Sequence, residues 1–292
     1  MRMNQNNTPL SWILWHPHQG LWNPALVGLV RSIIPLSPIS KLFTLFIIHI
    51  DTLILLLRAL TRRVSLLGFT SIVSKARVPD TISILYFHLG THKEAQELVL
   101  IVDKILPRIS DNVEAYGFEA SRESFDEAKA KFHKNKHVHL FNKALCCELP
   151  VGGNIKLYKD SGNGIGDSLY RKGGNYEEVE ALRLSDWFSE SNIDLEKSIC
   201  LLRMNIEGAE YDVLRDLVDN MLAQHIDGYF GMWDDVSKID LQRGNDFRAF
   251  LSDNQINSFT FNGRDMRWPL RVKCIEYAIE TAVQVGLRKI QR

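Results

Sequence analysis

The sequence lacks the patterns that mark several specialised classes of protein. Its 292 residues include four cysteines and no C-x-x-C pair, which argues against a thiolate zinc site and a disulfide framework and favours a reducing, cytoplasmic compartment. Lys plus Arg and Asp plus Glu both number 35, so no excess of charge indicates a nucleic-acid partner. The absence of a G-x-G-x-x-G loop argues against a nicotinamide-dependent oxidoreductase.

Long apolar runs are also missing. The strongly apolar stretch at 42–57 is shorter than the roughly 20 residues that cross a bilayer, and it contains His49 and Asp51. Three arginines lie in the six residues that follow it, which suits an anionic membrane surface. Three interpretations stay open: a buried or oligomer-forming helix, a helix on a membrane surface, and a true span. We expect residues 1–78, which include this stretch, to form an N-terminal apolar helical segment. A separate domain is expected at 79–292.

From residue 79 onward, short apolar runs alternate with stretches of helical spacing. This alternation predicts an α/β fold, a mainly parallel Rossmann-like sheet with helices on both faces. The glycine-rich, polar stretch at 152–176 indicates an irregular active-site loop or a small hairpin. We expect strands at 82–87, 113–118, 138–145, 198–206, 226–232 and 256–261, and helices at 93–105, 121–133, 209–221, around 247–251 and at 272–285.

Polar residues follow three of the expected strands, at the carboxyl ends where such sheets bind ligands. Segment 88–92 reads HLGTH, and its glycine permits a tight turn and a close approach of the backbone to a ligand. Glu119 ends the second strand, where an acid can accept hydrogen bonds from ribose hydroxyls or cap the next helix. Segment 203–210 reads RMNIEGAE, and its two glutamates also suit the positive end of a helix dipole.

These strand ends carry a family resemblance. LRMNIEGAE at 202–210, with VL at 213–214, resembles the "lKiDvEGaE..vL" signature of the FkbM-type methyltransferase family. Further segments look like other elements of the family in the same order. FEA at 118–120 looks like its "fEp" element, and NKAL at 142–145 resembles the end of its third strand. DSL at 167–169, together with VEALRLSDW at 179–187, looks like its "sSl … V.…LD" segment. The resemblance covers roughly residues 84 to 235.

The resemblance implies a seven-strand, class I methyltransferase fold that uses S-adenosyl-L-methionine to methylate a hydroxyl, often on a sugar or a secondary metabolite. The partner would then be a small-molecule or glycan substrate. The cofactor-binding residues that it implies are Gly90, Thr91, Glu119, Asn205 and Glu207. The loop at 152–176 would shape the acceptor site.

Three positions depart from the family pattern. The first motif, "D.GA..G", has His88 in place of its acid and Glu94 in place of its last glycine, and Asn205 replaces the Asp of the fourth strand. Loss of an acid that helps to hold a cationic ligand supports a second hypothesis, a catalytically inactive methyltransferase fold that acts as an interaction module. The intact Glu119 and EGAE elements favour the enzyme.

A hydroxyl acceptor needs a base within hydrogen-bond reach to remove its proton. His88, His92 and Asp234 stand near expected strand ends and are the candidate catalytic residues. His133 and His137 have the i, i+4 spacing of a metal site, but Asn135 and the strand expected from residue 138 end the helix there. A solvated loop is therefore the better interpretation, and no metal site is expected.

Overall fold

The computed structural model describes residues 77–160, 166–171, 174–260 and 268–291. The larger of the two compact units in the chain comprises Ala76–Gly263 and Arg271–Arg292. The segment expected at 1–78, with its apolar run at 42–57, lies almost wholly outside the described residues, so its three interpretations stay predictions. Within the described ranges, no helix is long and apolar enough to cross a membrane.

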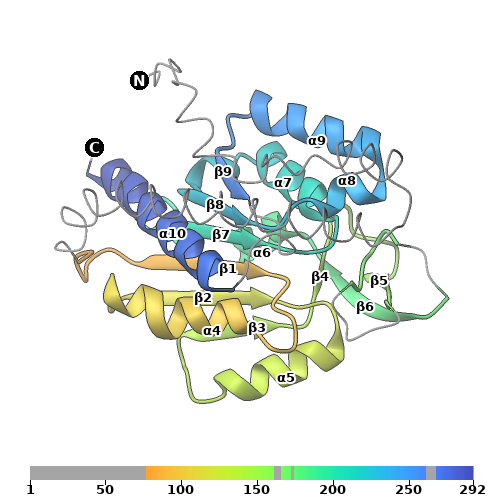
Figure 1. Ribbon diagram of the computed structural model, residues 1–292, viewed down its shortest axis with the longest axis horizontal. Coiled ribbons are helices and arrows are strands. Elements are labelled where there is room, and N and C mark those ends of the chain that lie inside the picture. Colours follow the sequence, from red (N-terminus) through yellow and green to blue (C-terminus); the bar gives the residue numbers. More distant parts are fainter. Residues whose placement is uncertain (1–76, 161–165, 172–173, 261–267, 292) are drawn as a thin grey trace, which may run out of the picture. The chain divides into compact units, whose positions relative to one another are not determined.

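A six-stranded sheet in which all neighbouring strands are parallel forms the centre of the domain (Figure 1). β1 and β7 lie in the middle, and every residue in them is buried, as befits strands covered on both faces. The strand order reverses between these two, which makes their carboxyl ends the switch point where such sheets bind ligands. In spatial order the strands are β3 (Val138–Phe141), β2 (Val113–Phe118), β1 (Ile84–Leu89), β7 (Ile199–Met204), β8 (Gly228–Gly231) and β9 (Ser258–Thr260).

Helices cover the sheet as the alternating sequence pattern predicted, which confirms the α/β class. An apolar cluster of buried side chains joins β1 and β7 to three helices, α6 (Leu184–Glu190), α7 (Glu210–Asp219) and α9 (Leu241–Asp253). On the opposite side, in front of the sheet in Figure 1, lie α4 (Gln96–Leu100) and α10 (Trp268–Ile290). The other α-helices in the described ranges are α5 (Arg122–Phe132) and the short α8 (Asp235–Ile239).

The single strand expected at 138–145 is interrupted. Its first half is β3, whereas its second half, β4 (Ala144–Leu145), leaves the main sheet and pairs with β6 (Tyr176–Leu182). The break falls at Asn142, whose side-chain amide donates to the carbonyls of Glu119 and Ala120 at 2.9 Å each. The end of β2 therefore redirects the chain, a long-range effect that local apolar spacing does not reveal.

The stretch 152–176, expected to be an irregular loop or a small hairpin, supplies the first strand of a hairpin, and the second strand begins at its last residue. β5 (Asn154–Tyr158) pairs antiparallel with β6, and β4, β6 and β5 form a small second sheet. The helix expected from residue 93 begins three residues later, at Gln96, because Ala95 before it takes a left-handed conformation (φ 46°). It continues as a π-helical turn at Ile101–Ile105 and a 3-10 turn at Leu106–Arg108.

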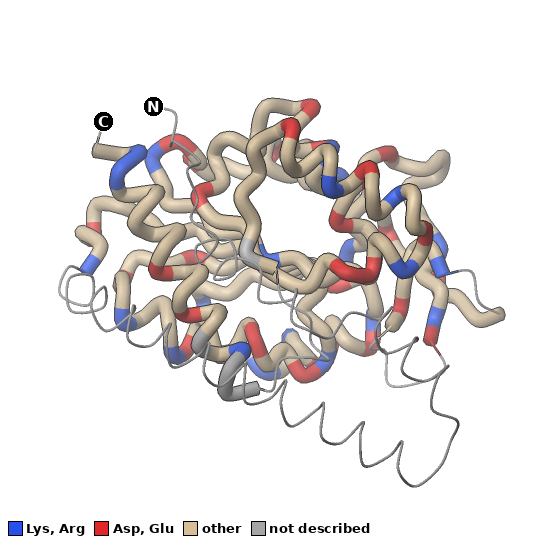
Figure 2. Tube along the Cα trace, turned by 45° about the horizontal axis from the view of Figure 1, so that its top comes forward, with Lys and Arg blue, Asp and Glu red and all other residues tan. Residues whose placement is uncertain are grey.

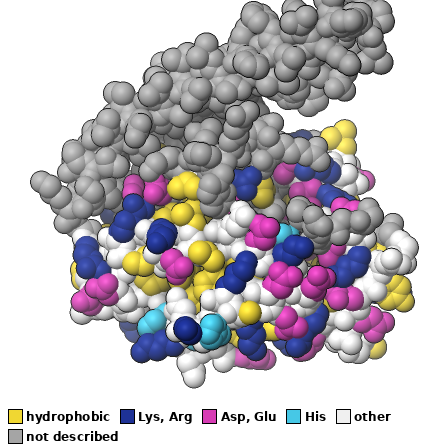
Figure 3. All heavy atoms as spheres, turned by 60° about the horizontal axis from the view of Figure 1, so that its bottom comes forward, with side chains coloured by type: hydrophobic (Ala, Val, Ile, Leu, Met, Phe, Trp, Pro, Cys, Tyr) yellow, Lys and Arg dark blue, Asp and Glu magenta, His cyan; other side chains and the backbone are white. Residues whose placement is uncertain are grey.

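Charged side chains of both signs are interspersed over the described surface. Basic and acidic positions are both spread over the described part of the chain trace in Figure 2. On the face drawn in Figure 3, no described region carries charge of one sign alone. This distribution matches the equal totals of basic and acidic residues, 35 each.

α10 packs on the sheet through contacts between small residues. A β-carbon added at Gly228 in β8 would overlap the methyl group of Ala282 in α10. One turn further along α10, a β-carbon at Gly286 would come within 2.9 Å of the Ile199 side chain in β7. The helix axis can therefore lie close to β7 and β8 only because these positions carry little or no side chain.

We predict that Gly228→Ala lowers the free energy of unfolding by about 1–3 kcal/mol, because interiors tolerate added methyl groups poorly. Adding Ala282→Gly should relieve most of that loss, although glycine within a helix itself costs about 1 kcal/mol. Urea denaturation of both single variants and the double variant measures the coupling. Gly174→Ala, where an added β-carbon meets no atom within 4 Å, is the control; additive effects at 228 and 282 would contradict the packing.

Candidate functional site

The turn after β1 is forced against the end of β7. Gly90 has φ 81°, and a β-carbon there would overlap the backbone carbonyl oxygen of Asn205. His92 and Ala95 also have positive φ, 58° and 46°, and such conformations cost non-glycine residues about 1–3 kcal/mol each. Interactions from neighbouring segments must therefore hold this turn in place.

Glu119, at the end of β2, supplies one of those interactions. Its carboxylate accepts hydrogen bonds from the backbone amide of His92 at 2.7 Å, the hydroxyl of Thr91 at 3.4 Å and the amide of Ser121 at 3.0 Å. Burial raises the pKa of this carboxyl group, and the two amide hydrogen bonds oppose the rise. Glu119 therefore connects the first turn to the start of α5, which adds a structural role to the two roles expected from the sequence.

Two buried polar atoms near the ends of β7 and β8 have no partner among the described residues. The backbone amide of Asn205 donates to Leu89 at 3.0 Å, but its side-chain oxygen Oδ1 accepts no hydrogen bond. The indole Nε1 of Trp233, a residue only 5% exposed, donates none. Leaving such atoms unsatisfied costs about 1–3 kcal/mol each. One acceptor and one donor near neighbouring strand ends are thus without a partner among the described residues.

The EGAE element turns sharply from β7 into α7. Glu207 has φ 51° and Gly208 φ 106°. The carboxylate of Glu210 accepts hydrogen bonds from the amides of Ile206 at 2.8 Å and Gly208 at 2.9 Å. Burial raises the pKa of Glu210 to about 7, against these hydrogen bonds. The second glutamate of the element therefore stabilises the turn, and the first remains closer to the surface.

The Glu207 carboxylate joins a cluster of charged groups. The Nη2 atom of Arg171 lies 3.4 Å from Oε2 of Glu207 and 2.5 Å from Oδ1 of Asp235. Burial, and then the charge of Asp235, raise the pKa of Glu207 to about 8, while Arg171 opposes the rise. Asp234 pairs with Lys238 at 2.6 Å. A carboxyl group that titrates near neutral pH is suited to proton transfer.

Segment 166–171 lies against this edge of the sheet. The Ser168 hydroxyl donates to the carbonyl of Glu207 at 2.7 Å, and the Tyr170 hydroxyl donates to Asp212 in α7. From the end of β5, Lys159 donates to the hydroxyl of Ser121 at 2.9 Å. Sequence reasoning gave Arg171 and Asp235 no role. The signal available was the resemblance of 167–169 to a family element.

The predicted site residues fall into two groups. Gly90, Thr91 and Glu119 are joined by direct contacts, and the Asn205 carbonyl lies against Gly90. His92 adjoins them through its backbone amide. Glu207 and Asp234 belong to the neighbouring charge cluster described above.

His88 lies inside the sheet instead. It is 1% exposed, and its Nδ1 lies 2.6 Å from the hydroxyl of Tyr86. Burial, and then the charge of Arg203, hold the pKa of His88 well below its ordinary value. A neutral, enclosed imidazole would need the strand to open before it could touch an acceptor.

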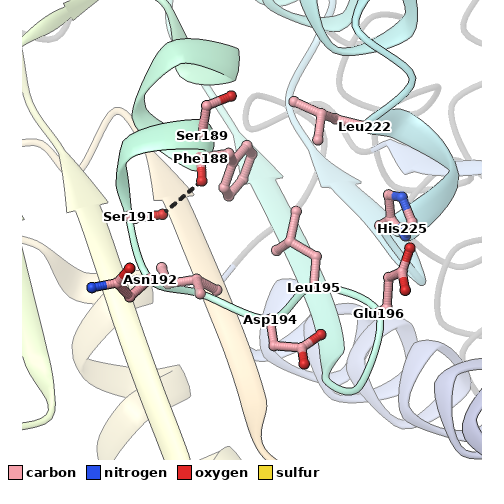
Figure 4. A pocket seen from close by; sticks show the side chains of 10 residues that line it. Phe188, Ser189, Ser191, Asn192, Asp194, Leu195, Glu196, Leu222 and His225 are labelled. Carbon is pink, nitrogen blue, oxygen red and sulfur yellow. Dashed lines mark hydrogen bonds between the residues drawn. The ribbon is translucent and has the colours of Figure 1, made fainter.

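An open cavity of about 490 Å³ lies elsewhere, near the amino ends of β7 and β8 (Figure 4). Its wall combines apolar Phe188, Leu195 and Leu222 with polar Asn192 and His225. None of the predicted site residues lines it. Ligands of parallel α/β sheets bind at the opposite, carboxyl edge, where the unsatisfied Asn205 and Trp233 atoms lie, so the candidate site is placed there.

The histidines near β3 have protein partners. His137 and His139 each lie 2.8 Å from a carboxylate oxygen of Glu114. His133 lies 2.7 Å from the carbonyl oxygen of Ala130. Within the described residues, no group of three or more His, Cys, Asp or Glu side chains is arranged to hold a metal ion.

A parallel α/β sheet with polar strand ends at its switch point defines a nucleotide-binding type of domain. The family described as the Methyltransferase FkbM domain matches the chain over residues 90–241. The chain therefore belongs to the FkbM methyltransferase-domain family. A search of curated proteins found no match.

We predict that Gly90→Ala unfolds or strongly destabilises the domain. An added β-carbon would both overlap the Asn205 carbonyl and strain a backbone at φ 81°, for which we expect a loss of at least about 2 kcal/mol. Gly152→Ala is a matched control, because it also has positive φ (88°) but meets no atom within 4 Å. Equal melting temperatures for the two variants would contradict the close approach of β1 and β7.

A second prediction concerns pH. The folded state raises the pKa of Glu207 from 4.5 to about 8, so unfolding releases a proton between these values. The contribution of Glu207 to the free energy of unfolding should therefore be most favourable below about pH 4.5. That contribution should fall as the pH rises to about 8. Glu207→Gln should flatten that fall and stabilise the domain at pH 8 by about 2 kcal/mol, since loss of the Arg171 ion pair offsets part of the gain.

Urea denaturation from pH 5 to pH 9 measures this effect. Glu190→Gln, which removes an exposed carboxylate at the end of α6, serves as the control. Glu210 contributes a fall of the same sign in both proteins, because its pKa is also raised, to about 7. Parallel pH profiles for the parent and Glu207→Gln would show that Glu207 ionises normally.

Proposed function

We propose that this protein is an S-adenosyl-L-methionine-dependent methyltransferase that methylates a hydroxyl group. Membership of the FkbM family supports methyl transfer. The observation that carries the cofactor site is the buried Oδ1 of Asn205, which has no hydrogen-bond partner among the described residues and belongs to the residue whose backbone carbonyl lies against Gly90. A donor on a ligand would satisfy this acceptor, which has no donor among the residues that the structure describes.

The residues at this edge fit the proposed cofactor. Asn205 Oδ1 can accept, and Trp233 Nε1 can donate, one hydrogen bond each. Gly90 keeps the turn close to the end of β7, and Thr91 and Glu119 hold the other side of the turn. S-adenosyl-L-methionine, when bound, supplies a methyl group that is already activated, so the protein mainly has to position the two reactants.

The acceptor hydroxyl must lose a proton during the transfer. His92 and Asp234 remain candidates for the base. Glu207, with its pKa near 8, joins them because it stands at the end of β7 and is partly exposed, at 18% of its side chain. The enclosed His88 is the least suited of the four.

The acceptor class follows from the family resemblance rather than from a described cavity. We propose a hydroxyl on a sugar, glycan or secondary metabolite. If the stretch at 42–57 touches a membrane, a lipid-linked or envelope glycan in reach of the cytoplasmic side becomes the favoured acceptor. If the stretch joins subunits, the protein acts as an oligomer.

One observation favours a second function, a catalytically inactive interaction module. The first motif has His88 where the family has an acid, and that histidine is enclosed beside Arg203. A protein of this kind would keep the sheet but bind no S-adenosylmethionine. Cofactor binding therefore separates the two proposals.

Titration of S-adenosylhomocysteine into the full-length chain by calorimetry is the test. We expect micromolar binding by the parent and about tenfold weaker binding by Asn205→Ala, the equivalent of about 1.4 kcal/mol. The melting temperature without ligand should not fall in Asn205→Ala, because the substitution removes an unsatisfied buried oxygen. Unchanged folding with weaker binding distinguishes a ligand contact from a structural residue.

Asn192→Ala is the control, since Asn192 lines the cavity at the amino edge. If Asn192→Ala binds S-adenosylhomocysteine more weakly and Asn205→Ala does not, the ligand binds in that cavity. A folded parent that binds no S-adenosylhomocysteine would contradict the enzyme and support the interaction module. Binding would justify a transfer assay with a labelled methyl group and a panel of sugar and glycan hydroxyls.

A further inference from the structure

A buried ion pair lies beneath the carboxyl end of β1. Arg203 in β7 and Glu97 in α4 are only 4% and 6% exposed. The Arg203 guanidinium contacts Glu97 Oε2 through Nε at 2.9 Å and through a second nitrogen at 2.6 Å. Arg271 in α10 approaches the other oxygen of Glu97 at 3.3 Å. Both Arg203 nitrogens share one carboxylate oxygen, and these charge-assisted hydrogen bonds hold the guanidinium against α4.

The same guanidinium also holds the turn after β1. Its remaining nitrogen donates to the backbone carbonyl of Gly90 at 3.0 Å and lies 3.4 Å from that of Leu89. Glu119 holds the other side of the turn through the His92 amide. The turn with positive φ at Gly90 and His92 is therefore held at two points, by Arg203 and by Glu119. The first of these contacts depends on Glu97, because Glu97 holds the Arg203 guanidinium.

The residue opposite Arg203 on β1 contributes no charge. His88 is the register partner of Arg203 in the β1–β7 pair, and its burial beside that cation keeps it neutral by holding its pKa low. The acid that balances Arg203 thus comes from α4. In the family motif quoted above, an acid stands at the position of His88 itself.

We propose that Glu97, acting through Arg203, positions the Gly90–Thr91–His92 turn for ligand binding and supplies the negative charge beside Arg203 that His88 does not provide. Glu97 touches no ligand and is a positioning residue. The inference rests on the proposed function for the identity of the ligand. The geometry of the turn, however, can be tested without any ligand. On this proposal, the acid beside Arg203 is Glu97 of α4, and the turn at Gly90 keeps the geometry that binds the ligand.

Four full-length proteins test the proposal: the parent, Glu97→Gln, the double variant Glu97→Gln/His88→Asp, and Glu127→Gln. The last removes an exposed carboxylate from α5 and is the matched control. The first readout is hydrogen exchange of the His92 amide without ligand. The second is the dissociation constant of S-adenosylhomocysteine.

Glu97→Gln should speed exchange of the His92 amide and weaken S-adenosylhomocysteine binding about tenfold, because a hydrogen bond from a charged group is worth about that factor. Adding His88→Asp should restore both values, since Asp at this position faces Arg203 across the strand pair and lies within reach of the Tyr86 hydroxyl. Glu127→Gln should match the parent.

Two results would overturn the proposal: unchanged exchange and affinity in folded Glu97→Gln, or losses that the second substitution does not reverse. If Glu97→Gln fails to fold, the double variant decides, because recovery of folding supports the charge replacement and continued failure contradicts it. If the parent binds no S-adenosylhomocysteine, the proposed function fails, and the exchange measurement alone still tests the role of Glu97.

Discussion

Gly90 and the carbonyl group of Asn205 lie closer together than a side chain at position 90 would permit, and the carboxyl edge of the sheet is arranged around that contact. It arises because β1 and β7 are adjacent, parallel and fully buried, so the chain must leave both strands at the same level. The turns that result are strained at His92, Ala95 and Glu207, all with positive φ.

Buried charged groups compensate for this strain. Glu119 and Glu210 each accept two backbone amide hydrogen bonds, one carboxylate at the turn after β1 and the other at the turn after β7. Arg203 donates to the carbonyl of Gly90 from the opposite side. Such charge-assisted hydrogen bonds are stronger than those between neutral groups. Acids that look like ligand contacts in a sequence motif therefore hold the backbone of these turns in place.

The proposed function assigns ligand binding and proton transfer to two different groups of residues at this edge of the sheet. The unsatisfied Asn205 and Trp233 atoms lie near the ends of β7 and β8, where a nucleotide would be held. The carboxyl groups of Glu207, Asp234 and Asp235 are grouped with Arg171 and Lys238. A site with these two parts suits the transfer of a group to an acceptor that must lose a proton.

Much of the fold was predictable because its signals are local. Apolar runs of strand length alternating with helical spacing indicated a parallel sheet, and the elements HLGTH and RMNIEGAE marked two of the strand ends that adjoin at the switch point. The break of the third strand into β3 and β4 was not predicted, because the Asn142 side chain that accompanies it binds residues more than 20 positions earlier.

The sequence by itself determined the α/β class, the order of the motifs and the family, since each depends on residues close together in the chain. Only the tertiary structure decided which acids serve the backbone, that His88 is enclosed, and that Glu97 balances Arg203 from 106 positions away. Burial and charge pairing depend on what the folded chain brings together, and spacing along the sequence does not record those contacts.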